Sequence, residues 1–464
     1  MGVHDVGTRH RRGQRRRDRV SRVTEMPDGP QDPYAQPARV VDARAGAEGD
    51  ELAIDMAAES AGELDGIALA AAEDPGVTEP RGRDMNDSHL VLCLVTLGDP
   101  RRLTGGYLYH LRVATAARRH GFRMVFLSLP ARPFPLPVLA APRVLGRVRH
   151  LRAAAILLDS IAAAFAGPWL AVRSPGAPVI GLLHQPPGGI DHGPVRTRLQ
   201  APLDCLGYRD ARLLIVASDH LADQLAAAGI KRERIRVVPP GRDVAAAPAE
   251  RGDLRRGRQA AFLCVANWIE RKGILELLDA VARLPAGMAT LHLAGKEDED
   301  RAYAARVRRR LAQPDLSGRV VAHGPLSGER VAALYAGADA FALPAFREPY
   351  GTVWGEAMAF GLPVVGWHAG NLPHLADDSR EALLVPPGDI DGLARALRRL
   401  AADPALRRRL GEAAHRRASE RPTWDQSAAL FFTAIRSALE ETPPGSVSVG
   451  ARRPLAARRR RRSP

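Results

Sequence analysis

Cysteine, lysine and aromatic residues are all scarce in this chain of 464 residues, and each scarcity excludes a class of protein. The three cysteines, Cys93, Cys205 and Cys264, are too few and too scattered for a disulfide framework or a zinc cluster, which favours a reducing, cytoplasmic setting. Aromatic residues make up 5% of the chain, which is low for a protein that stacks nucleic-acid bases. Nearly all of the 67 basic residues are arginine, and with the many alanines this indicates GC-rich coding of bacterial type rather than selection for nucleic acid.

Long hydrophobic runs are also missing. The best candidate, Ala153 to Val172, is interrupted by Asp159, so we expect no membrane-spanning helix of about 18 uncharged residues. The Arg-rich N-terminus lacks a following apolar region, so we expect no secretory signal. These features predict a soluble cytoplasmic protein. Its net charge of +15 is compatible with a peripheral contact to anionic lipids at the inner face of the membrane.

Both ends of the chain have the composition of disordered segments. Residues 1–84 begin with the arginine cluster Arg9 to Arg22 and continue as an acidic stretch with Ala, Gly and Pro, which cannot bury enough surface to fold. Met85 is a candidate for the native start. Residues 442–464 form a basic tail ending in Arg458 to Arg462, either as a solvated charge run or as a membrane-surface anchor.

Between these ends, apolar runs typical of buried strands alternate with helical segments, which predicts the α/β class with parallel sheets covered on both faces. A linker rich in Ala, Pro and Arg (Val244 to Arg258) separates two halves. We expect Rossmann-like domains at 85–248 and 255–425 around a central cleft, with ligands at the carboxyl ends of the strands. The predicted strands are His89 to Val95, Arg123 to Ser128, Ala154 to Leu158, Pro178 to Leu183, Leu213 to Val216, Ile235 to Val238, Ala261 to Val265, Thr290 to Leu293, Val320 to Ala322, Ala340 to Leu343, Pro363 to Val365 and Ala382 to Val385.

The most informative segment runs from Glu348 to Glu356. A strand precedes it, one carboxylate lies in the loop, and a helix that begins near Gly351 carries the second. The free N–H groups at the start of this helix suit a phosphate. Carboxylates beside a phosphate site fit best as acceptors for neutral hydroxyls, as on a sugar or a ribose. The segment therefore predicts a nucleotide-sugar site.

A second basic segment follows the strand at Ala261 to Val265 and opens a helix. Its Arg271 and Lys272 are placed to reach a diphosphate at that helix start and to neutralise charge as a leaving group departs. The simpler interpretation is a solvated basic pair at the end of a loop. One lysine in a chain dominated by arginine favours the functional interpretation slightly.

Taken together, Lys272-Gly273, His323-Gly324 and the Glu348-x7-Glu356 pattern closed by Gly361-Leu-Pro-Val-Val resemble the retaining family 4 glycosyltransferases of the GT-B fold. The resemblance covers roughly Leu90 to Phe432. It implies a GT-B architecture in which the second domain holds a nucleotide-diphosphate sugar, with a C-terminal helix at 426–441 that packs back on the first domain. The implied activity is transfer of the sugar to an acceptor (a glycan, a lipid or a small molecule) with retention, without an obligatory metal or other cofactor.

The resemblance assigns roles to particular residues of the second domain. Glu348 would face the donor sugar, and Glu356 would accept hydrogen bonds from the ribose. The N–H groups of Tyr350, Gly351 and Thr352 would hold sugar and diphosphate, and Lys272 would bind phosphate. The family usually has a Gly-Arg pair where this chain has Ala266-Asn267, so either Arg271 replaces that arginine or diphosphate binding is weaker.

In the first half, Gly105-Gly106 resembles the family's glycine loop, and a plain tight turn is the alternative. His184, at the end of a predicted strand, resembles the family histidine that meets the donor sugar across the cleft, although a strand-end histidine is usually structural. Ser218 matches a family serine and would equally serve as a helix N-cap. Gly241 is expected to supply an unusual backbone angle in a closing turn.

The sequence is also compatible with functions other than glycosyl transfer. The acidic run Glu297 to Asp300 resembles a metal site of the Asp-x-Asp kind, but four adjacent acidic residues on a loop are more typical of a solvated face. A sugar-nucleotide-binding protein or an epimerase can share the fold, and Asn267 favours the binding protein. A glycan phosphorylase would need a lysine-linked pyridoxal site, for which this chain has few lysines. The sequence does not identify the donor base, the sugar or the acceptor.

Overall fold

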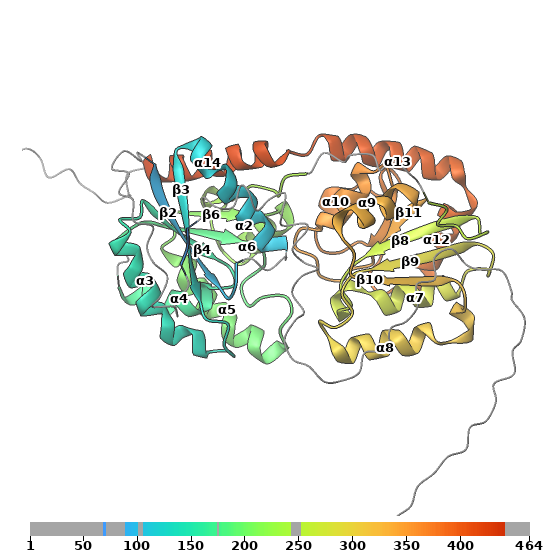
Figure 1. The fold of residues 1–464 in the computed structure, drawn as a ribbon, viewed down its shortest axis with the longest axis horizontal. Helices are drawn as coiled ribbons and strands as arrows, with labels where there is room; N and C mark the ends of the chain where they lie inside the picture. The colour runs from blue at the N-terminus through green and yellow to red at the C-terminus, as the bar shows by residue number, and fades with distance from the viewer. Residues whose placement is uncertain (1–67, 71–88, 101–104, 174–175, 243–251, 441–464) are drawn as a thin grey trace, which may run out of the picture. The chain divides into compact units, whose positions relative to one another are not determined.

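The computed structural model describes residues 68–70, 89–100, 105–173, 176–242 and 252–440, all within one compact unit, Ala53–Pro464 (Figure 1). Its first sheet has seven strands in the order β1-β3-β2-β4-β5-β6-β7, and every neighbouring pair is parallel. The strands are β1 (Ala68–Ala70), β2 (Leu90–Leu97), β3 (Phe122–Leu129), β4 (Ala155–Asp159), β5 (Val179–Leu183), β6 (Leu213–Val216) and β7 (Ile235–Val237).

Helices cover both faces of this sheet because successive side chains of its central strands are apolar on both sides. Cys93 and Val95 of β2 pack in one buried cluster with side chains of α3, α4 and α6, whereas Leu92 and Leu94 pack in another with α2. The helices are α2 (Gly105–Ala116), α3 (Ala141–His150), α4 (Ala163–Val172), α5 (Pro194–Arg209) and α6 (Asp219–Ala227), with short 3-10 turns at Ala117–His120, Leu136–Ala140 and Arg232–Arg234.

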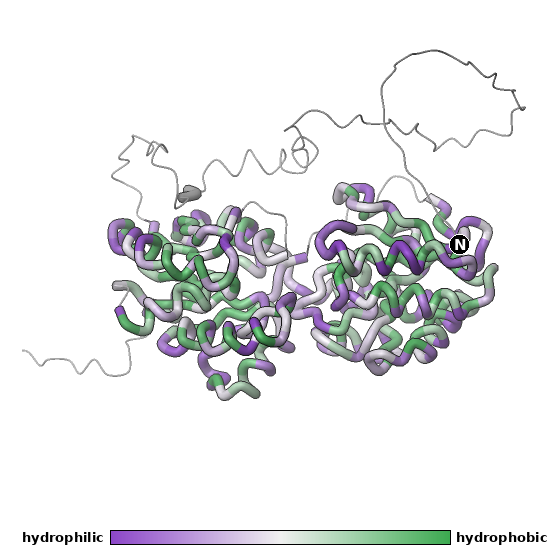
Figure 2. The backbone as a smooth tube through the Cα atoms, turned by 90° about the horizontal axis from the view of Figure 1, so that it is seen from below, coloured by the Kyte–Doolittle hydropathy of each residue, from purple (hydrophilic) through white to green (hydrophobic). Residues whose placement is uncertain are grey.

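The second sheet has six parallel strands in the order β10-β9-β8-β11-β12-β13. They are β8 (Ala260–Val265), β9 (Ala289–Ala294), β10 (Val320–Gly324), β11 (Ala340–Ala342), β12 (Val364–Trp367) and β13 (Ala382–Val385). The helices are α7 (Ile274–Ala282), α8 (Arg301–Leu311), α9 (Gly328–Gly337), α10 (Thr352–Ala359), α11 (Leu372–Leu375), α12 (Ile390–Ala402) and α13 (Pro404–Ser419), with 3-10 turns at Glu270–Lys272 and Pro314–Leu316. Along these helices the tube in Figure 2 alternates between hydrophobic and hydrophilic stretches, as amphipathic helices do.

The last described helix, α14 (Trp424–Glu440), contacts α2 and β6 of the first sheet rather than the second. Its Phe431 and Phe432 are buried with the side chains of β2 and β3, and the Phe432 ring stacks on Phe122 with centroids 5.3 Å apart. Arg212 also donates to the carbonyl oxygen of Ala438 at 3.0 Å. The chain therefore closes the core of its first sheet with its last helix.

The predicted α/β class with two parallel sheets is confirmed, and the predicted strands lie within a few residues of the observed ones. Two details differ. Ala68–Ala70 pair with β3, although they fall in the stretch 1–84 that was expected to be disordered; the rest of 1–84 and 442–464 lie outside the described residues. Gly241 does not adopt a positive φ, so the expectation of an unusual angle was wrong; a Cβ there would lie 2.3 Å from the Trp424 Cα, so this glycine provides space instead.

Among the helices of the described residues, none has both the length and the apolar character needed to cross a membrane.

Candidate functional site

A cavity of about 280 Å³ lies at the carboxyl ends of strands from both sheets. Seven of the residues singled out from the sequence line it: Gly105, Gly106, His184, Arg271, Glu348, Tyr350 and Thr352. The remaining lining residues are Tyr107, Asp159, Ser160, Ile161, Gln185, Ile190, Asp191, Ala217, Pro240 and Pro349. The predicted loops of the two halves therefore meet at one place.

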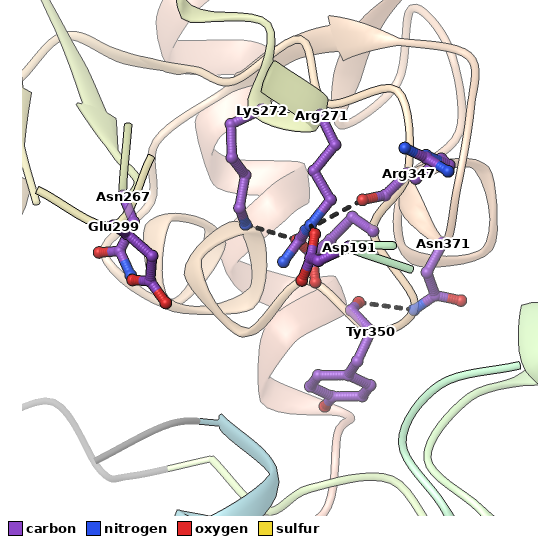
Figure 3. Close-up of polar contacts among 9 residues, drawn as sticks. Asp191, Asn267, Arg271, Lys272, Glu299, Arg347, Tyr350 and Asn371 are labelled. Carbon is purple, nitrogen blue, oxygen red and sulfur yellow. Dashed lines mark hydrogen bonds and ion pairs between the residues drawn. The ribbon is translucent and has the colours of Figure 1, made fainter. Parts of the chain in front are cut away.

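The carboxylate of Glu348 is held between two cations, Lys272 and Arg271. Figure 3 shows these two side chains extending from neighbouring positions of one loop. The Oε2 atom of Glu348 accepts hydrogen bonds from Lys272 Nζ at 2.5 Å and from Arg271 Nη1 at 3.0 Å. Arg271 also donates to the carbonyl oxygen of Arg347 at 3.0 Å and, through Nε, to Asp191 at 2.6 Å. The side chains of Glu348, Lys272 and Arg271 are each 13% exposed, so the two cations are largely buried with their carboxylate rather than a solvated basic pair.

Electrostatics keep this cluster ionised. Burial alone would raise the pKa of Glu348, but the charges of Lys272 and Arg271 and their hydrogen bonds outweigh it and hold that pKa at about 2. For Arg271, burial is likewise outweighed by Glu348 and Asp191, and its pKa is raised. Glu348 is therefore a carboxylate throughout the neutral range and has no proton to donate as a general acid.

Backbone contacts fix the loops that carry these side chains. Gly273 has φ +69°, and a Cβ there would lie 2.1 Å from the carbonyl oxygen of Pro344, so the Lys272 loop lies directly against the loop after β11. Phe346 donates its N–H to the Arg271 carbonyl at 2.8 Å. On the other side, Asn371 donates to the carbonyls of Glu348 and Tyr350, at 2.9 and 2.8 Å.

The start of α10 has the predicted geometry for binding an anion. Gly351 precedes the helix with φ +81°, and a Cβ there would lie 2.1 Å from the Trp354 ring, so only glycine fits. The N–H of Trp354 bonds to the Gly351 carbonyl at 3.1 Å. Within the described chain, the N–H groups of Gly351, Thr352 and Val353 donate no hydrogen bond, as expected for the first turn of a helix.

His184 reaches the cavity from the end of β5, in the first half of the chain. Its Nε2 lies 3.1 Å from Nε2 of His110 on α2, and its backbone N–H donates to Ser160 Oγ at 3.3 Å. The ring packs edge-on against Tyr109 with centroids 4.8 Å apart. Gly106 lies beside it, where a Cβ would be 3.6 Å from the ring.

The first half of the chain also holds the Glu348 loop directly. Ser218 caps α6 by accepting from the Leu221 N–H at 3.2 Å, and its hydroxyl donates to the carbonyl of Pro349 at 2.6 Å. The Tyr350 hydroxyl donates to the carbonyl of Pro240 at 3.0 Å, and Arg421 contacts the same tyrosine with a hydrogen bond and over its ring. Ser218 is thus both an N-cap and a contact to the site.

Five residues that the sequence suggested for this site do not line the cavity. Lys272 and Gly351 are next to lining residues in the chain, whereas the other three have partners elsewhere. Asn267 donates to Glu299 at 2.7 Å, and Figure 3 shows this pair apart from Lys272 and Arg271. His323 stacks on His292, with ring nitrogens 2.9 Å apart. The exposed Glu356 accepts from the Tyr335 hydroxyl at 3.0 Å, one turn into α10.

Sequence reasoning missed Asp191, His110 and the role of Asp159. Asp191 contacts Arg271 across 80 positions of sequence, and His110 contacts His184 across 74, so no spacing along the chain could reveal either pair. Of these three residues, only Asp159 could have been recognised from the sequence, because it is an acidic residue at the end of a fully buried strand. In the described ranges, no three or more His, Cys, Asp or Glu side chains are grouped so as to hold a metal ion.

Comparison with known proteins gives matches in both halves. Residues 85–241 match the model described as "Glycosyl transferase 4-like domain", and residues 248–417 match "Glycosyl transferases group 1". Among curated proteins, an MMP alpha-(1->4)-mannosyltransferase of Mycolicibacterium hassiacum is 34% identical over 229 residues, 49% of this chain and 54% of that protein. A D-inositol 3-phosphate glycosyltransferase of Streptomyces bingchenggensis is 33% identical over 156 residues, 34% of each chain. The matches thus span about half or less of these relatives.

Solved structures share the fold at lower identity. A sucrose-phosphate synthase from Thermosynechococcus elongatus superposes with a TM-score of 0.65 at 22% identity, over 75% of this chain and 99% of that one. The HepE protein of Anabaena, in complex with UDP, superposes with a TM-score of 0.61 at 20% identity, over 75% and 100%. At such identities the likeness concerns the fold alone.

Proposed function

Because the chain belongs to the GT-B glycosyltransferases, we propose that it transfers a sugar from a nucleotide-diphosphate sugar to an acceptor hydroxyl, with retention of the anomeric configuration. The observation that carries this proposal is the placement of Glu348 between Lys272 and Arg271, beside the first turn of α10. Cations and a helix N-terminus suit a diphosphate, and a permanently ionised carboxylate suits sugar hydroxyls. A nucleotide-diphosphate sugar combines a diphosphate with sugar hydroxyls, as few other ligands do.

We assign the diphosphate to Lys272, Arg271 and the N–H groups at Tyr350, Gly351 and Thr352. Both cations contact Glu348 through the same oxygen, Oε2, which leaves Oε1 to accept from a hydroxyl of the donor sugar. The exposed carboxylate of Glu356 is the proposed acceptor for the ribose hydroxyls. Asn267 is engaged with Glu299, which supports the proposal that Arg271 takes the place of the family arginine.

The transfer step we propose needs no basic side chain. The acceptor oxygen attacks the anomeric carbon from the face that the diphosphate leaves, so the new C–O bond forms where the old one breaks. The departing phosphate oxygen takes the bonding electron pair and then the acceptor's proton. Lys272, Arg271 and the α10 amides stabilise the negative charge on that oxygen, so neither a metal nor another cofactor is required by the proposal.

The relatives indicate where to begin a search for substrates. One is named for mannosyl transfer, another for an inositol 3-phosphate acceptor, and a structural neighbour was crystallised with UDP-glucose. We therefore propose a hexosyl donor and first test UDP among the nucleotides. The proposed acceptor is a glycan, a lipid or a small molecule.

The experiment is to incubate the purified full chain with individual nucleotide sugars, with and without acceptors, and to measure the nucleoside diphosphate formed. Acceptor-dependent release supports a glycosyltransferase, and NMR of the product's anomeric proton tests retention. Binding of a nucleotide sugar without any release would instead indicate a binding protein. Conversion of one nucleotide sugar into another without release would indicate an epimerase.

A peripheral contact with an anionic membrane is the partner that we propose on the basis of surface composition. Leu139, Val172 and Val195 are more than two-thirds exposed. Helices α4 and α5 cross in contact at Gly167, so the end of α4 and the start of α5 lie at the same end of the pair. Arg173 ends α4, and Arg196 and Arg198 lie in α5. Three more arginines lie in α3, which contacts α4: Arg143, Arg147 and Arg149. Cosedimentation with phosphatidylglycerol vesicles but not phosphatidylcholine vesicles supports this contact, and equal recovery with both contradicts it.

A further inference from the structure

Beside His184, two buried polar residues continue the polar wall of the first half of the chain. They are His110 on α2 and Asp159 at the end of β4, which are 1% and 2% exposed. Both oxygens of the Asp159 carboxylate have donors: Oδ2 accepts from Thr96 Oγ1 at 2.6 Å, and Oδ1 accepts from Ser160 Oγ and the Ile161 N–H, each at 3.3 Å. Burial raises the pKa of Asp159, and these hydrogen bonds act against that effect. All three contacts use the Asp159 oxygens as acceptors.

His110 lies between this carboxylate and His184. Its Nδ1 is 3.7 Å from Asp159 Oδ2 and has no hydrogen-bond partner in the described structure. Its Nε2 faces Nε2 of His184 at 3.1 Å. Only one of two nitrogens that face each other at this distance can carry the shared proton, so the contact requires opposite roles for the two rings.

Burial leaves both rings neutral. It lowers the pKa of His110 to about 3 and is the largest cause that lowers the pKa of His184 to about 3. Protonation of one ring would further oppose protonation of the other, and Asp159 acts in the opposite direction on His184. Each ring therefore carries one N–H. If His110 carries it on Nδ1, the proton points toward the Asp159 carboxylate. The other tautomer would place a lone pair of Nδ1 opposite Asp159 Oδ2, an oxygen that accepts from Thr96, which is unfavourable.

We propose that Asp159 and His110 are positioning residues that fix the tautomer of His184, with its proton on Nε2 and a lone pair on Nδ1 available to a sugar hydroxyl in the cavity. Asp159 orients His110, His110 Nε2 accepts from His184, and the second nitrogen of His184 is then an acceptor. That the hydroxyl belongs to a sugar rests on the proposed function. The tautomer of His184 rests only on the contacts among His184, His110 and Asp159.

A positioning role and a purely structural role of Asp159 predict different results for the variant Asp159→Asn. The asparagine amide keeps the volume but turns one of two acceptor oxygens into a donor, so it cannot satisfy Thr96 and His110 at Oδ2 and also the two donors at Oδ1. The preference of His110 for the Nδ1–H form is then lost. His110→Gln is the conservative variant, because its amide oxygen can accept from His184, whereas His110→Phe cannot.

The test is nitrogen-15 NMR of the full chain labelled at histidine, with the His184 signals identified by their loss in His184→Gln. We expect a protonated Nε2 and an unprotonated Nδ1 for His184 in the wild type and in His110→Gln. Asp159→Asn and His110→Phe should shift His184 toward the other tautomer. His292→Gln, which breaks the second histidine pair of the described structure at 2.9 Å, is the matched control and should leave His184 unchanged.

Kinetics provide the second readout. Asp159→Asn should lower kcat at least tenfold and leave the affinity for the nucleoside diphosphate within twofold, because the nucleotide does not contact the histidines; His110→Gln should recover most of kcat. A protonated Nδ1 on His184 in the wild type, or an unchanged His184 tautomer in both Asp159→Asn and His110→Phe, would overturn the proposal. The NMR readout needs no turnover, so absence of transfer in the wild type would count against the proposed function alone.

Discussion

At the scale of single residues, the account depends on one carboxylate and its two cations. Glu348 and Arg271 line the cavity, Lys272 supports Glu348 from beside it, and each is held by backbone contacts of its own loop. Because Glu348 has a pKa of about 2, it acts as a fixed negative charge rather than as an acid. The proposed chemistry uses that charge to hold a sugar and uses the two cations to receive the leaving phosphate.

Glu348→Gln separates these roles. The amide keeps one acceptor for the sugar but removes the charge that Lys272 and Arg271 share, so we expect turnover to fall by about 10²-fold, with nucleoside diphosphate affinity unchanged or higher. Glu348→Ala should lose more turnover because it also loses the acceptor. Steady-state kinetics with calorimetric titration distinguish the two, and Glu412→Ala, an exposed glutamate on α13, is the control. Near-native turnover of both Glu348 variants would remove this residue from the site.

Lys272→Met tests the diphosphate assignment. Methionine nearly fills the volume of the lysine stem but removes the charge, so we expect nucleoside diphosphate affinity to fall by about 10- to 100-fold. The control is Lys231→Met, because Lys231 is 75% exposed and lies in the first half of the chain. Equal affinities for the wild type and Lys272→Met would contradict the assignment.

Sequence reasoning was effective for residues whose neighbours in space are also set by strand order, and less so for the rest. Glu348, Lys272 and His184 follow buried strands, and the carboxyl ends of parallel strands meet at one edge. Asn267 also follows a strand and His323 lies near the end of β10, yet Glu299 and His292 contact their side chains. Those contacts depend on side-chain orientation. Orientation of this kind is not encoded in the spacing of residues along the chain.

At the scale of elements, the start of α10 is the feature on which the site depends most. The helix begins at Thr352 because Gly351 adopts a left-handed conformation that other residues rarely accept. The strand, loop and helix around it were predicted closely, because apolar runs and glycines mark their ends. Gly241 shows the limit of this reasoning: its neighbour, the backbone of Trp424, is distant in sequence.

Gly351→Ala should therefore damage fold and function together. A Cβ would meet the Trp354 ring at 2.1 Å, and a positive φ adds strain, so we expect a loss of stability of about 1–3 kcal/mol and weaker nucleotide binding. Gly146→Ala in α3, where the added Cβ has open space, should be neutral or slightly stabilising. Denaturant unfolding of both variants makes the comparison. Equal stability of the wild type and Gly351→Ala would contradict the described cap.

At the scale of the whole molecule, the site is assembled by contacts between the two halves of the chain. Ser218 and Pro240 of the first half bond to Pro349 and Tyr350 of the second, and α14 returns to the first sheet. The overall α/β architecture could be predicted from the alternation of strands and helices. These cross-contacts could not, since each joins positions more than 100 residues apart.

Acid should destabilise the whole molecule through buried groups at this site. Unfolded histidines bind protons below about pH 6.5, whereas folded His110 and His184 stay neutral down to about pH 3, so stability should fall as the pH drops through that window. Glu348 adds to the fall between about pH 4.5 and 2. Each group contributes up to about 1.4 kcal/mol per pH unit. Thermal unfolding from pH 7 to 4 should show a smaller drop in Tm for His110→Gln, and an equal drop in both proteins would contradict the folded pKa.

The most direct test of the central claim is acceptor-dependent release of nucleoside diphosphate, measured side by side for the wild type and Lys272→Met over a panel of nucleotide hexoses and acceptors. The account predicts that the wild type releases diphosphate from one nucleotide sugar when a matching acceptor is present, that the product keeps the anomeric configuration of the donor, and that Lys272→Met is at least 10²-fold slower. Release at the same rate by both proteins, or none by the wild type with any member of the panel, would contradict it.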